Sequence, residues 1–485
     1  MGKLSQLKPT QVWENFEAIC NIPHPSKKEE KIIQFMKEFG EKLGLKTIVD
    51  GVGNVIIKKP ATPGMENRQG IILQGHVDMV PQKNSDKVHD FEKDPIVPWI
   101  DGEWIKATGT TLGADNGLGV AAAMAVMQAK DLVHGPVECL FTVDEETGMT
   151  GAFELKAGIL DGDILLNLDS EDEGELYVGC AGGIDASVTY KYKEEPVPVN
   201  SVAYKLSMTG LKGGHSGLEI ILYRGNSNKL MNRFFKYAQK NFGIRISAIN
   251  GGSLRNAIPR ESFVTLVVPA VNEAAFLKSV STFEAMYIKE LSGVETDLKF
   301  VAEKTSMPSS VIDQKTQTNM IHAVYACPNG VIRMSDSMPG LVETSTNLAI
   351  VKTDNGVIKI ACLLRSSVDS AKDDLAEAVE STFTMSGAEV VLEGAYPGWK
   401  PNMKSAILKA ASEVYQKKFG KVPDIKAIHA GLECGLLGGV YPNWDMLSFG
   451  PTIRYPHSPD EKANIPSVQK FWDFLVEVLK NAPLK

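Results

Sequence analysis

The chain has 485 residues, a formal net charge of -8 at pH 7, and 43% hydrophobic and 23% charged residues. This length allows more than one domain with a large buried core, and the composition is typical of a soluble globular protein. The negative charge argues against a surface that binds nucleic acid or an anionic membrane, and no segment has the length and hydropathy of a bilayer span.

The N-terminal segment lacks the apolar core of a secretion signal, so we expect a cytoplasmic protein. The six cysteines form no C-x-x-C motif, and most of them stand among apolar residues. This distribution is typical of reduced thiols in a protein core, and it gives no support to metal binding by cysteine.

Helical and strand patterns alternate in the N-terminal part of the chain. Two amphipathic segments with a Pro-rich turn predict two helices, and two strands around a Gly/Asn turn follow, all within residues 10–59. An apolar strand at 70–75 comes next, and the Gly-rich loop 110–119 leads into an Ala-rich helix. Two further strands, at 137–143 and 163–168, end in acidic residues. This alternation predicts an α/β fold with a mostly parallel sheet covered by helices.

The sequence pattern changes after residue 184. From 185 to 397, alternating strands mix with helical segments, which predicts an inserted α+β lid domain, long enough for two similar halves. Its first stretch, 184–210, has the alternation and the Pro-containing turn of an antiparallel hairpin. The α/β pattern then returns and ends with a strand and a helix. We therefore predict a catalytic domain formed by 1–184 and 398–485, with the lid domain at 185–397.

Side chains that can bind metal ions follow several of the predicted strands. They are His76, Asp78, Asp115, Glu145, Glu146, Asp169 and His457. Binding sites of open α/β sheets form outside the carboxyl ends of the strands, so these side chains are expected to meet there. Any one of them has an ordinary structural explanation, such as a surface histidine or an exposed acidic loop. Their recurrence at strand ends favours a shared site.

The chemistry of this set favours zinc. Two imidazoles and at least three carboxylates, without thiolate, suit a borderline divalent metal with room for water. The Gly-rich loop around Asp115 lacks the Lys-Ser/Thr of a phosphate-binding loop, and its acid would repel phosphate. The set exceeds what one catalytic zinc needs, so two zinc ions that share a bridging carboxylate fit better.

Several motifs of the chain resemble those of a known family. GHVDMV, LGADNGLGVA, DEETG, NLDSE and PHSPDE are similar to the motifs of the di-zinc exopeptidases, which include carboxypeptidase G, succinyl-diaminopimelate desuccinylase and carnosinase. HAGLECGLL, GGSLRNAIP and the long lid resemble the aminoacyl-histidine dipeptidase branch, also called cytosol non-specific dipeptidases. The resemblance covers essentially the whole chain.

This resemblance implies a di-zinc exopeptidase catalytic domain with an inserted lid. The implied activity is hydrolysis of dipeptides with a free N-terminus, including Xaa-His dipeptides such as carnosine. The implied cofactors are two Zn2+ ions, for which Co2+ or Mn2+ are substitutes. Small dipeptides are the expected partners, nucleic acids and membranes are not, and a homodimer is one option for the assembly.

The resemblance also implies five zinc ligands: His76, Asp115, Glu146, Asp169 and His457. One zinc would take His76 and Glu146, the other would take His457 and Asp169, and Asp115 would bridge the two ions. The peptide bond that follows Asp115 is expected to be cis, as in relatives.

Three residues have other roles in the implied mechanism. Glu145 would be the general base, which takes a proton from the zinc-bridging water and returns it to the leaving amine. Asp78 would accept a hydrogen bond from the other nitrogen of His76 and so fix the ring. His215, in a Gly-rich turn of the lid, would donate a hydrogen bond to the oxyanion once the lid closes.

The two ends of a dipeptide need binding groups of their own. Arg365 ends an apolar strand and offers a bidentate fork for a carboxylate, and Asn256 matches a second carboxylate-binding position in relatives. A structural salt bridge is the competing explanation for Arg365. Glu433 and the backbone around Gly431 are candidates for binding the free amine.

Two other functions remain open from the sequence. An N-acyl amino acid amidohydrolase would use the same di-zinc site, and the metal motifs do not separate it from a dipeptidase. A zinc-binding protein without activity is the second alternative. It would be expected to lack the base, but DEETG retains Glu145.

Overall fold

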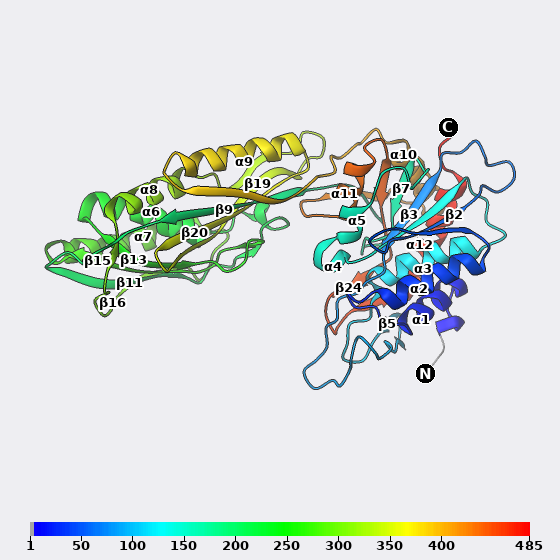
Figure 1. The fold of residues 1–485 in the computed structure, drawn as a ribbon, viewed down its shortest axis with the longest axis horizontal. Helices are drawn as coiled ribbons and strands as arrows, with labels where there is room; N and C mark the ends of the chain where they lie inside the picture. Colours follow the sequence, from blue (N-terminus) through cyan, green and yellow to red (C-terminus); the bar gives the residue numbers. More distant parts are fainter. Residues whose placement is uncertain (1–3) are drawn as a thin grey trace. The chain divides into compact units, whose positions relative to one another are not determined.

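The computed structural model describes residues 4–485, which form two compact units (Figure 1). The first unit contains the chain up to Gly179, together with Pro401–Ala427 and Leu432–Lys485. The second unit contains Cys180–Lys400 and the short segment Ile428–Gly431. The sequence pattern gave no sign that this short segment returns to the second unit.

A mixed eight-stranded sheet forms the centre of the first unit, with the order β1-β2-β6-β3-β7-β23-β8-β22. The four central strands, from β6 to β23, run parallel, whereas β1, β2 and β8 are antiparallel to the neighbours nearer the centre. Every residue of β3, β6 and β7 is buried, as expected of parallel strands covered on both faces. The bounds are β1 Lys46–Val49, β2 Val55–Lys59, β3 Ile71–His76, β6 Val137–Thr142, β7 Ile164–Asn167, β8 Glu175–Cys180, β22 Asp424–Ile428 and β23 Asp445–Ser448.

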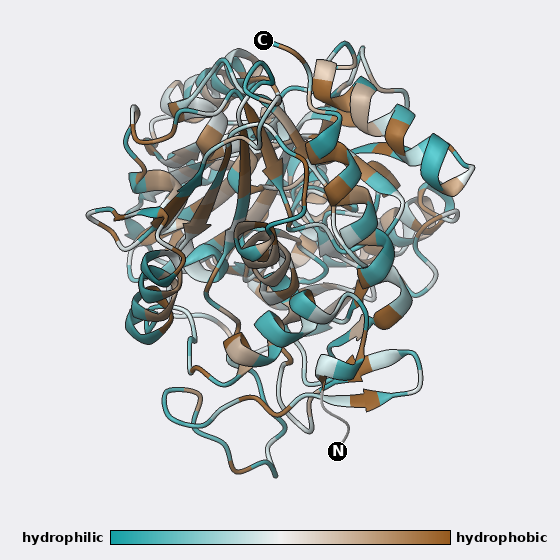
Figure 2. Ribbon diagram, turned by 90° about the vertical axis from the view of Figure 1, so that its right-hand side faces the viewer, coloured by the Kyte–Doolittle hydropathy of each residue, from teal (hydrophilic) through white to brown (hydrophobic). Residues whose placement is uncertain are grey.

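Helices cover this sheet, and Figure 2 shows its largely apolar strands among helices that carry many hydrophilic residues. The Ala-rich helix α3 is buried along nearly its whole length and packs against β3 and α1. The helices are η1 Leu4–Gln6, α1 Thr10–Cys20, α2 Glu30–Lys42, α3 Ala114–Gln128, α4 Glu145–Gly148, α5 Thr150–Glu154, α10 Ala406–Phe419, α11 Glu433–Val440 and α12 Ile465–Lys480. The predicted α/β class is confirmed.

A small four-stranded sheet in the first unit supports the chain on both sides of His457. β24 (Ile453–Arg454) pairs with β25 (Lys462–Asn464), β25 pairs with β5 (Trp104–Lys106), and β5 pairs with β4 (Trp99–Asp101). His457 lies in the loop that joins β24 to β25. The sheet therefore fixes both ends of the loop that carries this imidazole.

The second unit contains a nine-stranded sheet in the order β16-β11-β15-β13-β19-β20-β9-β21, with β18 paired to β19. The arrangement β16-β11-β15-β13 is repeated as β21-β9-β20-β19, and the two sets join where β13 pairs with β19. The strand bounds are β9 Gly182–Lys191, β11 Ser201–Thr209, β13 Arg245–Gly251, β15 Ser262–Pro269, β16 Lys299–Lys304, β18 Gly330–Met334, β19 Val342–Asp354, β20 Val357–Ser366 and β21 Glu389–Tyr396.

Four long helices, packed side by side, bury one face of this sheet in an aromatic-rich core that includes Phe234, Phe276 and Phe300. They are α6 Ser227–Phe242, α7 Glu273–Glu290, α8 Gln314–Ala326 and α9 Asp369–Thr384. The remaining short elements are β10 Glu194–Glu195, β12 Gly214–His215, β14 Ala257–Ile258, β17 Val311–Ile312, η2 Ile220–Leu222 and η3 Ala270–Asn272. No helix among residues 4–485 combines the length and hydropathy that a membrane span requires.

The antiparallel hairpin predicted at 184–210 is wrong. Both of its strands form, as β9 and β11, but they do not pair with each other. β9 pairs with β20 and β21, whereas β11 pairs with β15 and β16. Alternating hydropathy shows that a strand has one buried face, but it does not show which strand lies beside it.

Candidate metal centre and active site

The register of two parallel strands brings His76 and Asp169 together. His76 is the last residue of β3, which pairs with β7 so that Gln74 lies opposite Asn167. Asp169 follows β7 by two residues, and the same register places it beside His76. The His76 Nε2 atom lies 3.5 Å from Asp169 Oδ1, and the His76 side chain is only 1% exposed.

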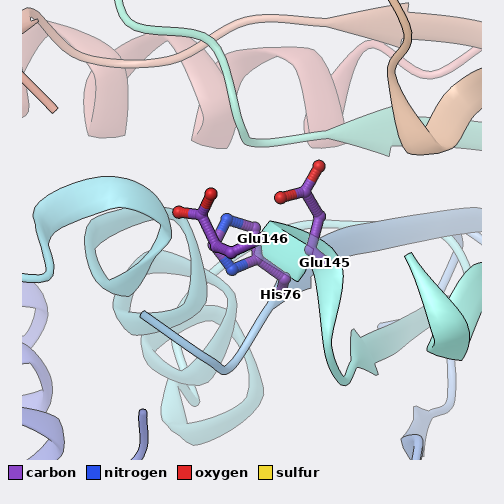
Figure 3. Close-up of side chains that lie close together, drawn as sticks. All are labelled: His76, Glu145 and Glu146. Carbon is purple, nitrogen blue, oxygen red and sulfur yellow. The ribbon is translucent and has the colours of Figure 1, made fainter. Parts of the chain in front are cut away.

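Glu145 and Glu146 come from the other side of β3. They follow β6, the second parallel neighbour of β3, and form the start of the short helix α4. Figure 3 shows both side chains next to the His76 ring. A ligand atom of each glutamate and one of His76 lie within 4.8 Å of one another.

The carboxylate of Asp115 lies between two imidazoles. Its Oδ1 atom is 3.2 Å from His76 Nε2, and its Oδ2 atom is 3.2 Å from His457 Nε2. His457 Nε2 also lies 2.9 Å from Glu146 Oε2. Asp115 therefore belongs to two groups that could each hold a metal ion. These groups are His76, Asp115 and Asp169, and Asp115, Glu146 and His457.

The distances favour a pairing of the ligands that differs from the predicted one. The prediction joined Glu146 to His76 and Asp169 to His457. The distances instead place Asp169 with His76, and the shortest contact of Glu146 is to His457. Strand order accounts for Asp169, because β7 lies directly beside β3 in the sheet, but it does not account for Glu146, because β6 lies beside β3 as well. Order along the chain does not reveal order across the sheet.

Asp78 holds both His76 and the turn that carries the two glutamates. Its Oδ1 atom lies 3.4 Å from His76 Nδ1 and accepts a hydrogen bond from the Glu145 N–H at 3.0 Å. Its Oδ2 atom accepts the Glu146 N–H at 3.3 Å and the Ser26 hydroxyl at 2.8 Å. The Asp78 carbonyl oxygen accepts a hydrogen bond from His76 Nδ1 at 3.0 Å. The main chain and the carboxylate of Asp78 together hold the imidazole and the adjacent acids relative to each other.

The acids of this cluster outnumber its imidazoles. Burial raises the pKa of Glu145 and Asp169 well above the usual carboxylate range. Burial acts in the same direction on Asp115, but hydrogen bonds with the two imidazoles outweigh it and hold the pKa of Asp115 below its usual value. Within residues 4–485, Glu146 Oε1 and Asp169 Oδ1 are buried and accept no hydrogen bond. This donor set, with its excess of negative charge, fits bound divalent metal ions.

Glu461 is a residue that sequence reasoning missed. Its carboxylate is 2% exposed and accepts four backbone N–H groups, those of residues 112–115, at 2.7 to 3.2 Å. The loop that ends in Asp115 is therefore fixed by a side chain that follows His457 by four residues. The bond from Asp115 to Asn116 is cis, which confirms that prediction. Nothing in the sequence distinguishes Glu461 from an exposed acid of the same motif.

Glu433 is buried in the first unit beside the ends of β3 and β6. Its Oε2 atom accepts hydrogen bonds from Gln74 Nε2 at 2.6 Å and Thr142 Oγ1 at 3.0 Å. Its Oε1 atom is buried and accepts none from the described part of the chain. Burial raises the pKa of Glu433 to about 7. The charges of His76 and Asp78 also act on Glu433, so it belongs to the surroundings of the cluster.

A further group of buried acids, Glu29, Asp78 and Asp144, has a structural explanation. Glu29 Oε1 accepts the N–H groups of Lys27 and Asp144, at 2.8 and 3.2 Å. Asp144 accepts two threonine hydroxyls, and Asp78 has the donors described above. These oxygens are already occupied by donors that hold the turn in front of Glu145.

His215 and Asn256 lie next to each other in the second unit. His215 pairs with Ala257 between β12 and β14, and the Asn256 carbonyl accepts the Ser216 N–H at 2.9 Å. The His215 Nδ1 atom accepts the N–H groups of Gly217 and Leu218, at 3.1 and 3.0 Å. The proton of a neutral imidazole must then be on Nε2, which makes Nε2 the donor. Burial, followed by the charge of Arg365, lowers the pKa of His215.

Arg365, near the end of β20 in the second unit, is an unpaired buried cation. The residue is 5% exposed, and it forms no ion pair with any acid of the described chain. Its Nη1 group donates to the Tyr396 hydroxyl at 3.1 Å, and its Nε group is buried without a partner. A structural salt bridge therefore does not explain Arg365. A buried guanidinium that lacks an anion is suited to bind one.

Comparison with known proteins identifies the family. The sequence model of peptidase family M20/M25/M40 matches residues 72–481. The chain is 48% identical over 486 residues to the cytosol non-specific dipeptidase of Escherichia coli (strain K12), with 100% of each chain covered. The structure of aminoacylhistidine dipeptidase from Vibrio alginolyticus matches with a TM-score of 0.97 at 48% identity, over 100% of this chain and 99% of that one.

The structure of aminopeptidase PepT from Bacillus cereus matches with a TM-score of 0.61 at 17% identity, over 98% of this chain and 99% of that chain, and it shows the shared fold alone. The resemblance predicted from the sequence motifs is confirmed, as is the prediction of an enzyme. The chain belongs to peptidase family M20/M25/M40.

Proposed function

We propose that this chain is a dipeptidase that hydrolyses small dipeptides, Xaa-His dipeptides among them, at a site for two metal ions. The observation that carries this proposal is the position of the Asp115 carboxylate between His76 and His457. A carboxylate with one oxygen toward each site suits two metal ions held about 3.5–4 Å apart. The names of the relatives from Escherichia coli and Vibrio alginolyticus support the substrate class.

The proposed metal ligands divide into two sets around Asp115. One ion would be held by His76 and Asp169 and the other by His457 and Glu146, and Asp115 would be shared by the two. Zinc is the proposed metal because imidazole nitrogen and carboxylate oxygen without thiolate suit it, and cobalt or manganese are substitutes. When bound, the ions supply Lewis-acid activation of water and of the substrate carbonyl.

Glu145 is the proposed general base. It takes a proton from the attacking water and delivers it to the leaving amine, a role that requires a carboxylate which both accepts and releases a proton. Burial raises the pKa of Glu145 above the usual carboxylate range, the direction that favours holding the proton between the two transfers. Asp78 keeps Glu145 in place through the backbone N–H and holds the His76 ring through Nδ1.

His215 is the proposed donor to the carbonyl oxygen as negative charge develops on it. Its Nδ1 atom is already used as an acceptor, so the Nε2 proton is available for an outside group. The lowered pKa keeps the ring neutral, and a neutral donor of fixed tautomer holds its proton while it stabilises the oxyanion.

The two ends of the dipeptide are proposed to bind to different residues. Arg365 binds the free carboxylate, because it is a buried guanidinium with unused donors and no anionic partner in the described part of the chain. Asn256 is the proposed second donor to this carboxylate. Glu433, with one buried oxygen that accepts no hydrogen bond from residues 4–485, is proposed with the backbone at Gly431 for the ammonium group.

The test of the proposed function is a hydrolysis screen of the metal-reconstituted protein. We expect dipeptides, including Xaa-His, to be cleaved faster than acetyl or succinyl amino acids of the same C-terminal residue. Faster release of the C-terminal amino acid from the acetyl or succinyl substrates would instead identify an N-acyl amino acid amidohydrolase. We also propose a cytosolic location, the compartment that the name of the Escherichia coli relative includes.

Glu145→Ala is expected to retain both metal ions and to lower kcat by about 10²–10⁴-fold, because it removes the base and no ligand. Glu146→Ala serves as the matched comparison, since it is expected to lose one metal equivalent. Zinc content after dialysis and turnover of a Xaa-His dipeptide are measured on both variants. Loss of zinc from Glu145→Ala, or near-normal turnover, would show that Glu145 is not the base.

Glu461→Gln is expected to weaken zinc binding by about 10–100-fold, the effect typical of residues that orient metal ligands. The amide offers one acceptor in place of two, so part of the loop up to Asp115 loses its hydrogen bonds. Zinc affinity is measured by titration of the metal-free protein with a competing chelator. Excess zinc is expected to restore turnover.

Glu138→Gln is the control for this experiment. Glu138 is also a buried carboxylate of the first unit, and it accepts the N–H groups of Asp161 and Gly162 and pairs with Lys58. Its substitution is expected to lower thermal stability without changing zinc affinity. An equal loss of zinc affinity in both variants would mean that Glu461 acts through general stability.

A further inference from the structure

We propose that Tyr396 is a positioning residue, which directs the guanidinium of Arg365 and thereby sets the preference for substrates with a free carboxylate. This inference rests on the proposed function, because it requires Arg365 to bind the carboxylate of the dipeptide. Every residue used in the argument lies in the second unit.

Four neighbouring strands of the second unit place these residues in one row. Ser345 of β19 pairs with Arg365 of β20, Arg365 pairs with Gly183 of β9, and Gly183 pairs with Tyr396 of β21. Residues that are directly opposite in antiparallel strands project to the same face of the sheet. Tyr396 and Arg365 therefore share a face and are separated only by a residue without a side chain.

The absence of a side chain at Gly183 makes the contact between Tyr396 and Arg365 possible. A Cβ atom at Gly183 would lie 2.6 Å from Cε1 and 2.7 Å from both Cζ and the hydroxyl oxygen of Tyr396. The ring thus lies where the side chain of residue 183 would be. From there, its hydroxyl reaches Arg365 Nη1 at 3.1 Å.

Gly431 limits the Tyr396 ring as well. A Cβ atom at Gly431 would lie 3.2 Å from Cε2 of the ring. The ring therefore occupies a slot formed by two glycines, one on β9 and one in the short segment 428–431. This slot fixes the direction in which the hydroxyl meets the guanidinium, and a larger residue at either glycine would disturb it.

The chemistry of the tyrosine explains why it positions Arg365 without neutralising it. Burial raises the pKa of Tyr396, so the hydroxyl is an uncharged acceptor for Nη1. A carboxylate at this position would form an internal ion pair and cancel the charge that the substrate needs. Asp185, whose charge also interacts with Arg365, forms its ion pair with Arg255 at 3.6 Å instead.

The two histidines near Arg365, His215 and His429, both have a lowered pKa. His429 Nε2 lies 2.7 Å from Ser345 Oγ, and burial, helped by Arg365 and His215, lowers the pKa of His429 to about 3. The pKa of His215 is lowered too. The lowered pKa values favour the neutral form of both rings, so the direction of the Arg365 guanidinium matters for how a carboxylate is bound. The hydrogen bond that Arg365 donates to the Tyr396 hydroxyl therefore contributes to specificity.

The test compares a Xaa-His dipeptide with the same dipeptide amidated at its C-terminus, both assayed on the zinc-loaded protein. Arg365→Lys is expected to raise KM for the free acid by about 10–100-fold and to leave KM for the amide unchanged. Tyr396→Phe keeps the ring over Gly183 and removes the hydroxyl alone. It is expected to raise KM for the free acid by about fivefold, with kcat and the amide substrate little changed.

The double variant shows whether Tyr396 acts through Arg365. If it does, Tyr396→Phe adds no further increase in KM when Arg365 is already lysine. Gly183→Ala, which displaces the ring, is expected to raise KM for the free acid in the same selective way. Tyr190→Phe is the control. Tyr190 is a buried tyrosine of β9, the strand that carries Gly183, and its hydroxyl contacts Ser386. This substitution is expected to change KM for neither the free acid nor the amide.

Two sets of outcomes would overturn the inference, and they are distinguishable. If Arg365→Lys affects the free acid and the amide equally, the proposed role of Arg365 fails and the inference fails with it. If Arg365→Lys discriminates but Tyr396→Phe does not, or if the two substitutions have additive effects, only the positioning role of Tyr396 is wrong.

Discussion

The shared carboxylate of Asp115 is the constraint on which the rest of the site depends. Both of its oxygens face imidazoles, one from the end of β3 and one from the loop between β24 and β25. A carboxylate can face two partners in this way only if its backbone is held firmly. Glu461 supplies that restraint by accepting four consecutive N–H groups, and it belongs to the same loop as His457. The bridging acid and one imidazole are thus fixed by a single buried side chain.

The two units carry opposite kinds of unbalanced charge. In the first unit, buried carboxylates outnumber the imidazoles beside them, which suits cations. In the second unit, Arg365 is buried and pairs with no acid among residues 4–485, and burial lowers the pKa of the neighbouring imidazoles. Burying an unbalanced charge costs stability unless a ligand compensates for it. We interpret the excess of carboxylates in the first unit as a site for metal ions. We interpret the buried charge of Arg365 as a site for the carboxylate of the substrate.

The sequence pointed to most of the residues of this cluster because they follow strands, and the carboxyl ends of parallel strands meet at one edge of a sheet. Asp115 was indicated instead by its Gly-rich loop at the start of α3. The sequence did not allow the position of Asp169 beside His76 to be predicted, since that depends on which strands are neighbours. The predicted hairpin failed for the same reason. Glu461 and Tyr396 escaped prediction because their roles depend on contacts with distant backbone or side chains. The residues next to Glu461 in the sequence do not show that it accepts hydrogen bonds from a distant loop. Those next to Gly183 do not show that the Tyr396 ring lies against it.

Zinc titration of the metal-free Asp115→Ala variant tests the central claim most directly. Because one carboxylate serves both ions, the account predicts two tightly bound equivalents in the unsubstituted protein and weakened binding of both equivalents in the variant. His457→Ala should weaken only one of the two. Two unchanged binding events in Asp115→Ala, or the loss of a single equivalent with the other at full affinity, would contradict a shared ligand.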